Sequence, residues 1–339
     1  MTQHETLLTV DNLRKYFPVR GGLLQTVQAQ VKAVDGVSFT VQRGEIVGIV
    51  GESGCGKSTL ARLLQRLIEP DAGAITFEGQ DMLRASLAEL KAFYRQVQMV
   101  FQDPYSSLNP RMNIEDAVAF NARVHGHSRR TARARAWEVL PRVGLRAEQF
   151  GRRYPHELSG GQRQRVNIAR ALVLEPKLVI LDEPVSSLDK SVQAQVLNLL
   201  QQLQQDLGLT YLFISHDLHV IEYLSDRVLV MYLGQIMEMG NAEEIAAAPL
   251  HPYTQALFAS APSMNPDERL DHPPLTGDPP NPINPPSGCR FRTRCIHAMD
   301  VCAGETPPLR PVGTTGRQVA CYLYSEQGEP QPVQTSQAG

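Results

Sequence analysis

The sequence predicts an α/β fold in which helices cover a mostly parallel sheet. Short apolar runs of strand length recur along the chain, and helical patterns separate several of them. The runs are residues 45–51, 178–181, 211–214 and 227–231, and the clearest helical patterns are 57–68 and 191–207. Strands that alternate with helices are typical of parallel sheets buried on both faces. Residues 31–41 instead alternate apolar and polar side chains, which predicts a strand of a half-exposed antiparallel sheet.

Length and composition describe an ordinary globular protein. The 339 residues are 42% hydrophobic and 20% charged, which is enough apolar mass for a core. The net charge of −2 gives no indication of binding to nucleic acid or to an anionic membrane. No apolar run approaches the ~20 residues of a membrane span, and the N-terminus lacks a signal pattern. We therefore expect a cytosolic protein that reaches a membrane only through a partner.

A phosphate-binding loop follows the first buried strand. Residues 51–58 read Gly-Glu-Ser-Gly-Cys-Gly-Lys-Ser, the full G-x4-G-K-S pattern between a strand and a helix. Its glycines allow backbone N–H groups to turn toward phosphates, and the next helix points its positive end at them. Lys57 is expected to neutralise the β- and γ-phosphates of ATP, and the Ser58 hydroxyl to bind Mg²⁺. The loop residues assigned to the nucleotide are Gly51, Ser53, Gly54, Cys55, Gly56, Lys57, Ser58 and Thr59. Cys55 is interpreted as a small residue that fits the loop rather than as a redox group.

Two carboxylates end the apolar run Leu-Val-Ile-Leu-Asp-Glu at residues 178–183. Asp182 fits the role of holding Mg²⁺ through its water shell, and Glu183 that of polarising the attacking water. Many strands end in acidic residues, but a phosphate-binding loop upstream makes this pair a strong indication of ATP hydrolysis.

A second anion cradle is indicated by Leu-Ser-Gly-Gly-Gln at residues 158–162. The motif stands ahead of an apparent helix at 162–174, where the first backbone N–H groups of the helix are free. The residues concerned are Ser159, Gly160, Gly161 and Gln162. The loop at residues 51–58 is already expected to bind the γ-phosphate. A second anion-binding motif in the same chain is therefore expected to face the ATP of another subunit. By itself the motif could also be a helix cap.

These motifs, in this order, resemble the ABC transporter ATPase family over about residues 7–260. The resemblance implies a P-loop fold with a RecA-like core, an antiparallel β subdomain and a helical subdomain at about 90–165. Together these would make a nucleotide-binding domain of residues 1–246. The resemblance also implies a head-to-tail pair of subunits, in which each phosphate loop faces the Ser159 motif of the other chain.

The same resemblance assigns four further residues to the nucleotide site. Gln102, in Phe-Gln-Asp-Pro at 101–104, would sense Mg²⁺ and touch the membrane partner. Asp189 ends the motif Ser-Ser-Leu-Asp at 186–189, which would be the D-loop of the family, and His216 would be the switch histidine that contacts the γ-phosphate. Phe17 would stack on adenine, with its neighbour Tyr16 as a rival.

The C-terminal part resembles the extension of the dipeptide, oligopeptide and nickel importer ATPases. Residues 249–254 read Pro-Leu-His-Pro-Tyr-Thr, and cysteines follow. Residues 104–111 and 154–158 are more similar to the F-type subunits (DppF, OppF) than to the D-type. The resemblance implies an ATPase that powers import of di- or oligopeptides, or alternatively of nickel or another small solute. It also implies a D-type ATPase partner, two transmembrane permease subunits and, indirectly, a solute-binding protein, with the chain peripheral on the cytoplasmic face of the inner membrane.

Four cysteines define the extension, which we place at residues 247–324. Cys289, Cys295, Cys302 and Cys321 are spaced C-x5-C-x6-C-x18-C. In a reducing cytosol such a set indicates a metal or cofactor site rather than disulfides. Zinc sites usually show closer cysteine pairs, whereas iron–sulfur clusters tolerate open spacing. The family resemblance favours a [4Fe–4S] cluster, with Zn²⁺ or unligated thiols as alternatives. A proline-rich connection at 262–286 precedes them, and residues 325–339 are expected to be disordered.

Other classes of protein fit less well. Soluble ABC ATPases of translation or DNA repair carry two cassettes or a long coiled coil, but this chain has one cassette and no heptad run. The arginine-rich segment 128–153 has no aromatic residues interleaved as stacking platforms, so we interpret it as a solvated helical face and expect no nucleic-acid partner. A tail that senses redox state or metal and regulates the ATPase is compatible with the importer hypothesis.

Overall fold

A computed structural model describes residues 5–21, 26–260, 280–325 and 328–329. The chain forms two compact units, and each is described by itself. Unit 1 consists of Met1–Thr9, Thr40–Ile46 and Ile75–Ser215. Unit 2 consists of Val10–Phe39, Val47–Ala74 and His216–Gly339. None of the helices among the described residues combines the length and the hydropathy that a membrane span requires.

Unit 1 contains three parallel strands, β6 (Val97–Val100), β7 (Leu178–Asp182) and β8 (Thr210–Ile214). Every residue of these strands is buried. Burial on both faces explains why the sequence shows continuous apolar runs here instead of alternation. The strands predicted at 178–181 and 211–214 are confirmed.

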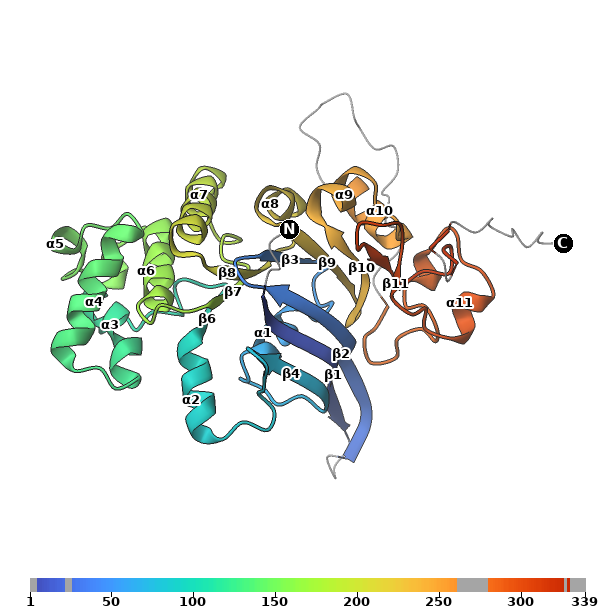
Figure 1. Ribbon diagram of the computed structural model, residues 1–339, viewed down its shortest axis with the longest axis horizontal. Coiled ribbons are helices and arrows are strands. Elements are labelled where there is room, and N and C mark those ends of the chain that lie inside the picture. The colour runs from blue at the N-terminus through green and yellow to red at the C-terminus, as the bar shows by residue number, and fades with distance from the viewer. Residues whose placement is uncertain (1–4, 22–25, 261–279, 326–327, 330–339) are drawn as a thin grey trace. The chain divides into compact units, whose positions relative to one another are not determined.

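Four helices of unit 1 begin at a polar side-chain cap. α3 (Ile114–Val124), α4 (Arg129–Arg142), α5 (Ala147–Phe150) and α6 (Gly160–Leu172) lie between β6 and β7 in the sequence and form one cluster (Figure 1). α2 (Leu87–Gln96) precedes β6, and α7 (Lys190–Leu207) connects β7 to β8. Gly208, with φ of 61°, ends α7 in the left-handed region. The side chains that accept the first N–H groups are Ser86, Asn113, Ser128 and Ser159.

The arginine-rich segment forms α4, as a solvated helical face. Its buried residues are small or aliphatic, among them Ala132 and Leu140. Arg133 pairs with Glu115 at 2.7 Å and with Asp116 at 3.1 Å. The arginines of this helix thus serve local ion pairs and solvent contact, as the sequence predicts.

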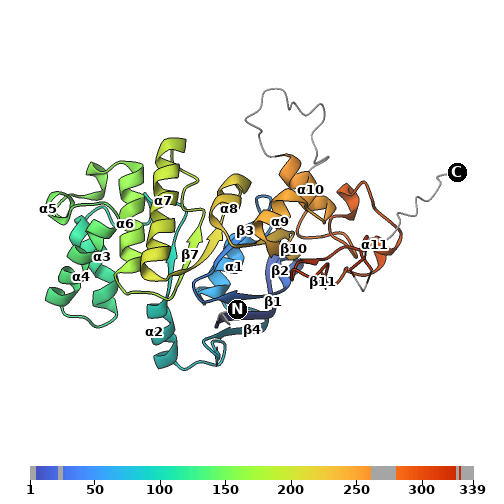
Figure 2. The same ribbon diagram turned by 45° about the horizontal axis from the view of Figure 1, so that its top comes forward.

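Unit 2 contains the strands β11 (Arg310–Pro311), β12 (Gln318–Val319), β10 (Gln235–Asn241), β9 (Arg227–Tyr232) and β3 (Ile46–Val50), adjacent in that order. β3 is parallel to β9, whereas β10 is antiparallel to both β9 and β12. α1 (Lys57–Leu64) follows β3, and α8 (Leu218–Leu224) precedes β9. α9 (Ala242–Ala247) and α10 (Pro252–Ala259) lie beside β10 (Figure 2). The cysteine-bearing segment adds η2 (Arg292–Arg294) and α11 (Val301–Gly304).

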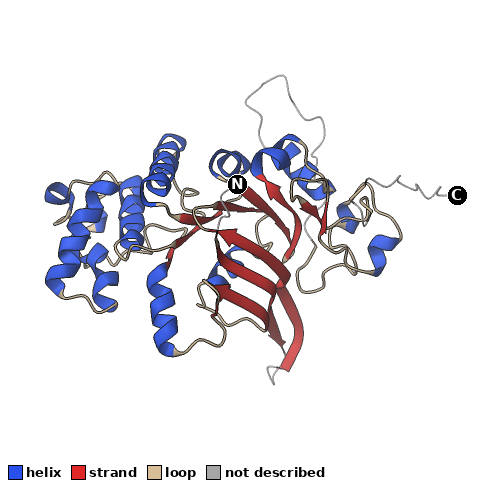
Figure 3. Ribbon diagram, viewed as in Figure 1, coloured by secondary structure: helices blue, strands red, loops and turns tan. Residues whose placement is uncertain are grey.

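A second sheet is formed by β2 (Thr26–Gln42), β1 (Thr6–Gly21), β4 (Ala72–Phe77) and β5 (Gln80–Asp81), in that order, and its strands are red in Figure 3. β4 and β5 are antiparallel. Within β2, Val37, Phe39 and Val41 are buried and the residues between them are half-buried. The alternation predicted at 31–41 is therefore present.

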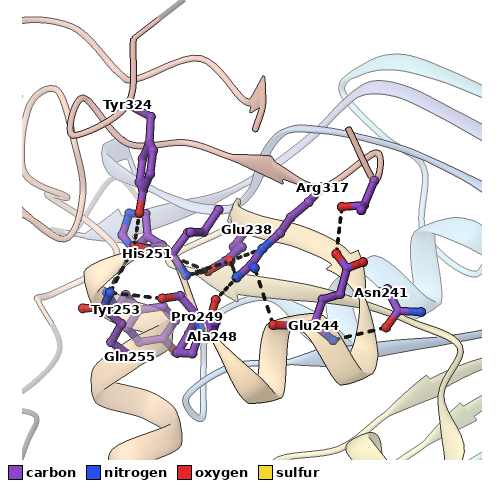
Figure 4. A network of polar contacts seen from close by, with 12 residues as sticks. Glu238, Asn241, Glu244, Ala248, Pro249, His251, Tyr253, Gln255, Arg317 and Tyr324 are labelled. Carbon is purple, nitrogen blue, oxygen red and sulfur yellow. Dashed lines mark hydrogen bonds and ion pairs between the residues drawn. The ribbon is translucent and has the colours of Figure 1, made fainter. Parts of the chain in front are cut away.

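A buried ion pair fixes the C-terminal strands in unit 2 (Figure 4). Glu238 on β10 is fully buried, and Arg317 donates to it at 2.6 Å. The same carboxylate accepts the backbone N–H groups of Leu250 at 3.0 Å and His251 at 2.9 Å. A buried carboxylate is tolerated when it is paired and hydrogen-bonded in this way. Glu238 thereby ties the start of α10 and the segment before β12 to the sheet.

Two sequence predictions need correction or lie outside the described residues. The helix predicted at 57–68 ends at Leu64, because Arg66 adopts φ of 54°, outside the helical region. The proline-rich connection at 262–286 is described only from residue 280. Of the predicted disordered tail, only residues 325, 328 and 329 are described.

Candidate functional site

The phosphate-binding loop connects β3 to α1 within unit 2. A Cβ atom at Gly51 would lie 2.1 Å from the Met231 carbonyl oxygen, and one at Gly56 would lie 2.1 Å from the Ala33 carbonyl oxygen. Both glycines also have positive φ angles, 150° and 108°. Only glycine fits these two positions. The main chain can therefore fold tightly enough to present its N–H groups to an anion.

The first turn of α1 begins without a side-chain cap. Gly56 occupies the N-cap position and supplies no side-chain acceptor. The positive end of a helix with uncapped N–H groups is a binding site for phosphate. Ser58 and Thr59 lie in this first turn, both half-buried, and Ser53 and Gly54 are exposed in the loop before it.

Lys57 folds back over the loop. Its Nζ donates to the carbonyl oxygens of Gly51 at 2.7 Å and Glu52 at 3.1 Å, and only 5% of the residue is exposed. The same Nζ lies 3.8 Å from Sγ of Cys55. Burial raises the pKa of the Cys55 thiol, so this sulfur stays protonated, in agreement with its interpretation as a packing residue. The ammonium group is thus held inside the loop that would receive the phosphates.

The two predicted carboxylates lie at the end of β7 in unit 1. Asp182 is 4% exposed, and the backbone N–H of Glu183 donates to the Ile214 carbonyl oxygen at 3.0 Å. Glu183 has φ of 48°, a conformation that a residue with a side chain adopts at a cost of about 1–3 kcal/mol. Such conformations cluster at functional sites because they aim a side chain in a defined direction.

Gln102 lies against this carboxylate. Its Nε2 donates to Oε2 of Glu183 at 2.9 Å, although the two residues are 81 positions apart. The sequence predicted both residues for the site but gave no contact between them. The hydrogen bond orients the Glu183 carboxylate, and a defined orientation is what a group that accepts a proton from water requires.

The Ser159 motif forms the start of α6 in unit 1 and is a complete capping box. The Gln162 N–H donates to Oγ of Ser159 at 3.3 Å, and the Ser159 N–H donates to Oε1 of Gln162 at 3.0 Å. A Cβ at Gly161 would lie 2.3 Å from Val192 on α7, whereas Gly160 has more space. Ser159 itself is exposed. The motif is therefore a helix cap at an exposed helix start, and its role as an anion-binding motif for another subunit stays a prediction.

Three further predicted residues are placed as follows. His216 is exposed just after β8, and Asp189 is exposed at the N-cap of α7 without a side-chain cap bond.

Phe17 on β1 is 38% exposed, with Nζ of Lys15 5.7 Å from its ring centroid. The hydroxyl of Tyr16 donates to Asp35, and burial together with this bond raises the pKa of Tyr16 to about 12. Because Tyr16 is engaged, the exposed ring of Phe17 is the better candidate for stacking.

The four tail cysteines lie together in unit 2. Cys289 and Cys302 are each 8% exposed, and the Cys289 N–H donates to the Cys302 carbonyl oxygen at 2.9 Å. Burial, with smaller contributions from Cys302 and Cys295, raises the pKa of the Cys289 thiol to about 11. Burial raises the pKa of Cys321 to about 12, with contributions from the other three cysteines. Cys321 is therefore near enough to the other three cysteines for their charges to affect its titration.

The arrangement of the cysteines does not by itself indicate a metal site. Across the described ranges, no three or more His, Cys, Asp or Glu side chains are arranged to hold a metal ion. This arrangement supports neither the zinc site nor the [4Fe–4S] cluster expected from the sequence, although four thiolates are the ligand type that both groups use.

Sequence reasoning missed the contacts of Glu52, the second residue of the phosphate loop. Tyr253 and Arg294, both from the C-terminal extension, bind it. The His-Pro-Tyr triplet at 251–253 marked the subfamily, but its spacing carried no signal of a contact about 200 residues away.

Two known families match the chain. The family described as ABC transporter matches residues 34–186. The family described as oligopeptide/dipeptide transporter, C-terminal region, matches residues 237–302, which include three of the four tail cysteines.

Individual proteins match over nearly the whole length. The chain is 50% identical to the oligopeptide transport ATP-binding protein AppF of Bacillus subtilis, over 95% of this chain and 98% of AppF. It is 46% identical to the dipeptide transport ATP-binding protein DppF of Escherichia coli, over 97% of this chain and 98% of DppF. Among solved structures, the ATP-binding cassette MJ0796, a dimer in a post-hydrolysis state with ADP and Pi, is 27% identical with a TM-score of 0.61, over 70% of this chain and 99% of that one.

Proposed function

The chain belongs to the ABC transporter ATP-binding proteins, in the branch with the oligopeptide/dipeptide transporter C-terminal region, and on this premise we propose that it hydrolyses ATP to power peptide import. AppF and DppF are named for oligopeptide and dipeptide transport, which favours peptides over nickel as the solute. The observation that carries the proposal is the phosphate loop, in which Gly51 and Gly56 admit no side chain and after which α1 begins without a side-chain cap.

In the proposed mechanism, each predicted residue acts on bound ATP. The N–H groups of the loop and of α1 hold the phosphates, and Lys57 exchanges the carbonyl oxygens of Gly51 and Glu52 for phosphate oxygens. Ser58, Asp182 and Gln102 would hold Mg²⁺, which neutralises charge on the phosphates. Glu183, oriented by Gln102, accepts the proton of the attacking water. His216 and Phe17 are assigned to the γ-phosphate and the adenine ring.

Substitution of the catalytic carboxylate tests this mechanism. Glu183→Gln should bind MgATP as the wild type does but lose about 10²- to 10⁴-fold in turnover, because the water loses its proton acceptor. Lys57→Ala should instead weaken binding itself. Binding is measured with a fluorescent ATP analogue and turnover by phosphate release. Turnover of the Glu183→Gln complex near that of the wild type would overturn the assignment.

We propose that the active unit is a pair of ATPase subunits in which Ser159, Gly160, Gly161, Gln162 and Asp189 complete the site of the other chain. The partners in this proposal are a D-type ATPase subunit and two permease subunits at the cytoplasmic face of the inner membrane, and the relatedness to DppF supports a transporter of this kind. The purified chain alone should then hydrolyse ATP slowly. Robust, cooperative hydrolysis and transport with this chain as the sole ATPase would count against the mixed pair.

The domain division is part of the proposal. Residues 1–246 would form the nucleotide-binding domain, with its helical subdomain at about 90–165, and residues 247–324 the extension. The oligopeptide/dipeptide family match begins at residue 237, close to the start of this extension.

We further propose that Cys289, Cys295, Cys302 and Cys321 bind one [4Fe–4S] cluster, which orders the extension. Around these cysteines only the short η2 and α11 and the two-residue β11 and β12 supply regular structure, so a four-thiolate cross-link would contribute much of its stability.

The metal content of the anaerobically purified chain tests this. About four irons per chain and a broad absorption near ~400 nm are expected. Cys295→Ser should lose both, whereas Cys55→Ser, which removes a buried thiol outside the set, should keep them. Colourless protein with one zinc per chain would contradict the cluster.

A further inference from the structure

Glu52, the second residue of the phosphate loop, is held from two directions by the C-terminal extension. Its backbone N–H donates to the hydroxyl of Tyr253 at 2.9 Å. Its carboxylate accepts Nη1 of Arg294 at 2.8 Å and Nη2 at 3.1 Å. All three residues belong to unit 2. The loop that would bind phosphate is thus contacted by residues about 200 and 240 positions away in the sequence.

Tyr253 is held in a rigid place. It is fully buried, and its ring centroid lies 4.6 Å from that of Tyr232 and 5.4 Å from that of Phe291. Its backbone N–H donates to Nδ1 of His251 at 2.9 Å. The backbone N–H of His251 in turn donates to the carboxylate of the buried Glu238. A hydroxyl on such a support cannot move freely, so it fixes the position of the Glu52 N–H. The His-Pro-Tyr triplet at 251–253 therefore anchors the phosphate loop at Glu52.

Arg294 is a paired and shielded cation. Its side chain is 6% exposed and that of Glu52 is 20% exposed. A second donor contact reaches the Tyr232 hydroxyl at 3.3 Å. A planar guanidinium that binds both oxygens of a carboxylate fixes its orientation as well as its charge. Removal of one partner from so shielded a pair leaves the other charge uncompensated.

We propose that Arg294 and Tyr253 are positioning residues of the phosphate loop, and that Arg294 neutralises Glu52 so that the loop can accept the anionic phosphates of ATP. The inference rests on the proposed role of the loop in binding ATP. An uncompensated carboxylate between Gly51 and the phosphate-binding N–H groups would repel the ligand and release the loop from its fixed shape. The extension then sets the affinity for ATP and takes no part in the chemical step.

Arg294 connects the cysteine-bearing segment to the phosphate loop through its ion pair with Glu52. Cys295 follows it directly, and Arg290, which follows Cys289, pairs with Asp35 and donates to the Leu233 carbonyl oxygen. Phe291, which lies between these two arginines in the sequence and is 2% exposed, packs against Tyr232 and Tyr253. Whatever orders Cys289 and Cys295 therefore also orders the residue that holds Glu52.

The test is a titration of the full chain with a fluorescent ATP analogue and Mg²⁺, combined with steady-state hydrolysis. Arg294→Ala should raise the Kd and the KM for ATP about tenfold, while kcat stays within about twofold. Arg294→Lys should recover part of the loss, because it restores charge without the two-pronged geometry. Tyr253→Phe, which removes one hydrogen bond, should raise Kd about threefold.

Two variants separate charge neutralisation from loss of structure. Glu52→Gln should rescue Arg294→Ala to within about threefold of the wild-type Kd, since no charge then needs a partner. Arg292→Ala is the matched control, because Arg292 lies two residues away on the same segment and its guanidinium donates to the carbonyl and hydroxyl oxygens of Ser287 instead of to Glu52. Its Kd should equal that of the wild type. Circular dichroism confirms that each variant is folded.

Each outcome decides the inference. A folded Arg294→Ala chain with the wild-type Kd overturns it, as does a double variant that binds as weakly as Arg294→Ala. If Arg294→Ala does not fold, Arg294→Lys and Glu52→Gln decide. The account predicts that Glu52→Gln abolishes the effect of Arg294→Lys, and an effect that persists contradicts it. Failure of the proposed function looks different, because the wild-type chain itself would then not bind MgATP, or would bind it as well after Lys57→Ala.

Discussion

Two helix starts in this chain follow glycine-rich motifs and differ in one respect. α1, in unit 2, begins after Gly56 with no side-chain cap. α6, in unit 1, begins after Ser159, and Ser159 and Gln162 bind the N–H groups of one another's backbone. The N-cap of α1 therefore supplies no side-chain acceptor, whereas that of α6 supplies the Ser159 hydroxyl.

From this difference we infer that the phosphate loop before α1 and the Ser159 motif at the start of α6 have different functions. An uncapped helix start inside a sterically fixed loop gains most from an anion, so it can bind ATP in a single chain. A capped start gains less, so it contributes when a nucleotide already held elsewhere is brought against it. We therefore assign binding to α1 and completion of the site to α6, with the water-activating carboxylate in the same unit as α6.

The largest expected effect is on the loop before α1. Gly56→Ala should abolish measurable MgATP binding, a loss of about a hundredfold or more, because its Cβ would strike the Ala33 carbonyl oxygen and its φ is 108°. Gly54→Ala is the control. Its φ of 76° is strained as well, but nothing lies within 4 Å of the added Cβ, so binding should fall far less. Equal losses in titrations of the two variants would show that space at Gly56 does not matter.

A smaller effect is expected where the chemistry is assigned. Gln102→Ala should lower kcat about tenfold through loss of the hydrogen bond to Glu183. The Kd for MgATP should rise less, by about threefold, because Ser58 and Asp182 would still hold Mg²⁺. Single-turnover hydrolysis with a parallel binding titration measures both. A rise in Kd without a change in kcat would place Gln102 with the binding residues of α1 instead.

The smallest effect is on stability. Ser159→Ala should lower the free energy of unfolding by about 1 kcal/mol, because the capping box of α6 is lost. Ser53→Ala is a suitable control, since this exposed loop serine caps no helix. Chemical denaturation measures the difference. Equal stability of the two variants would show that the cap contributes little and would weaken the contrast between the helix starts.

Much of this arrangement follows from local sequence. The buried strands at 178–181 and 211–214 were predictable because parallel strands buried on both faces need continuous apolar runs. The early end of α1 was not, since nothing in the apolar pattern signals the left-handed conformation of Arg66. The contact of Arg294 with Glu52 was also not predictable from the sequence, because it joins residues 242 positions apart and depends on the tertiary structure.

The motif after residue 158 shows where sequence reasoning stops. It indicated both a cap and an anion cradle, and the structure supports the cap directly. Whether the same exposed helix start also meets a nucleotide depends on a second chain, which no pattern within one chain can specify.

The central claim is tested most directly by one comparison of Ser159→Ala with the wild type. The Kd for MgATP is measured on the isolated subunit, and kcat on the transporter assembled with its partner subunits. The account predicts an unchanged Kd, within about twofold, and a kcat at least about tenfold lower, because Ser159 meets only the nucleotide of the other chain. A Kd on the isolated subunit that weakens as much as kcat falls would place Ser159 at the ATP of its own chain and contradict the account.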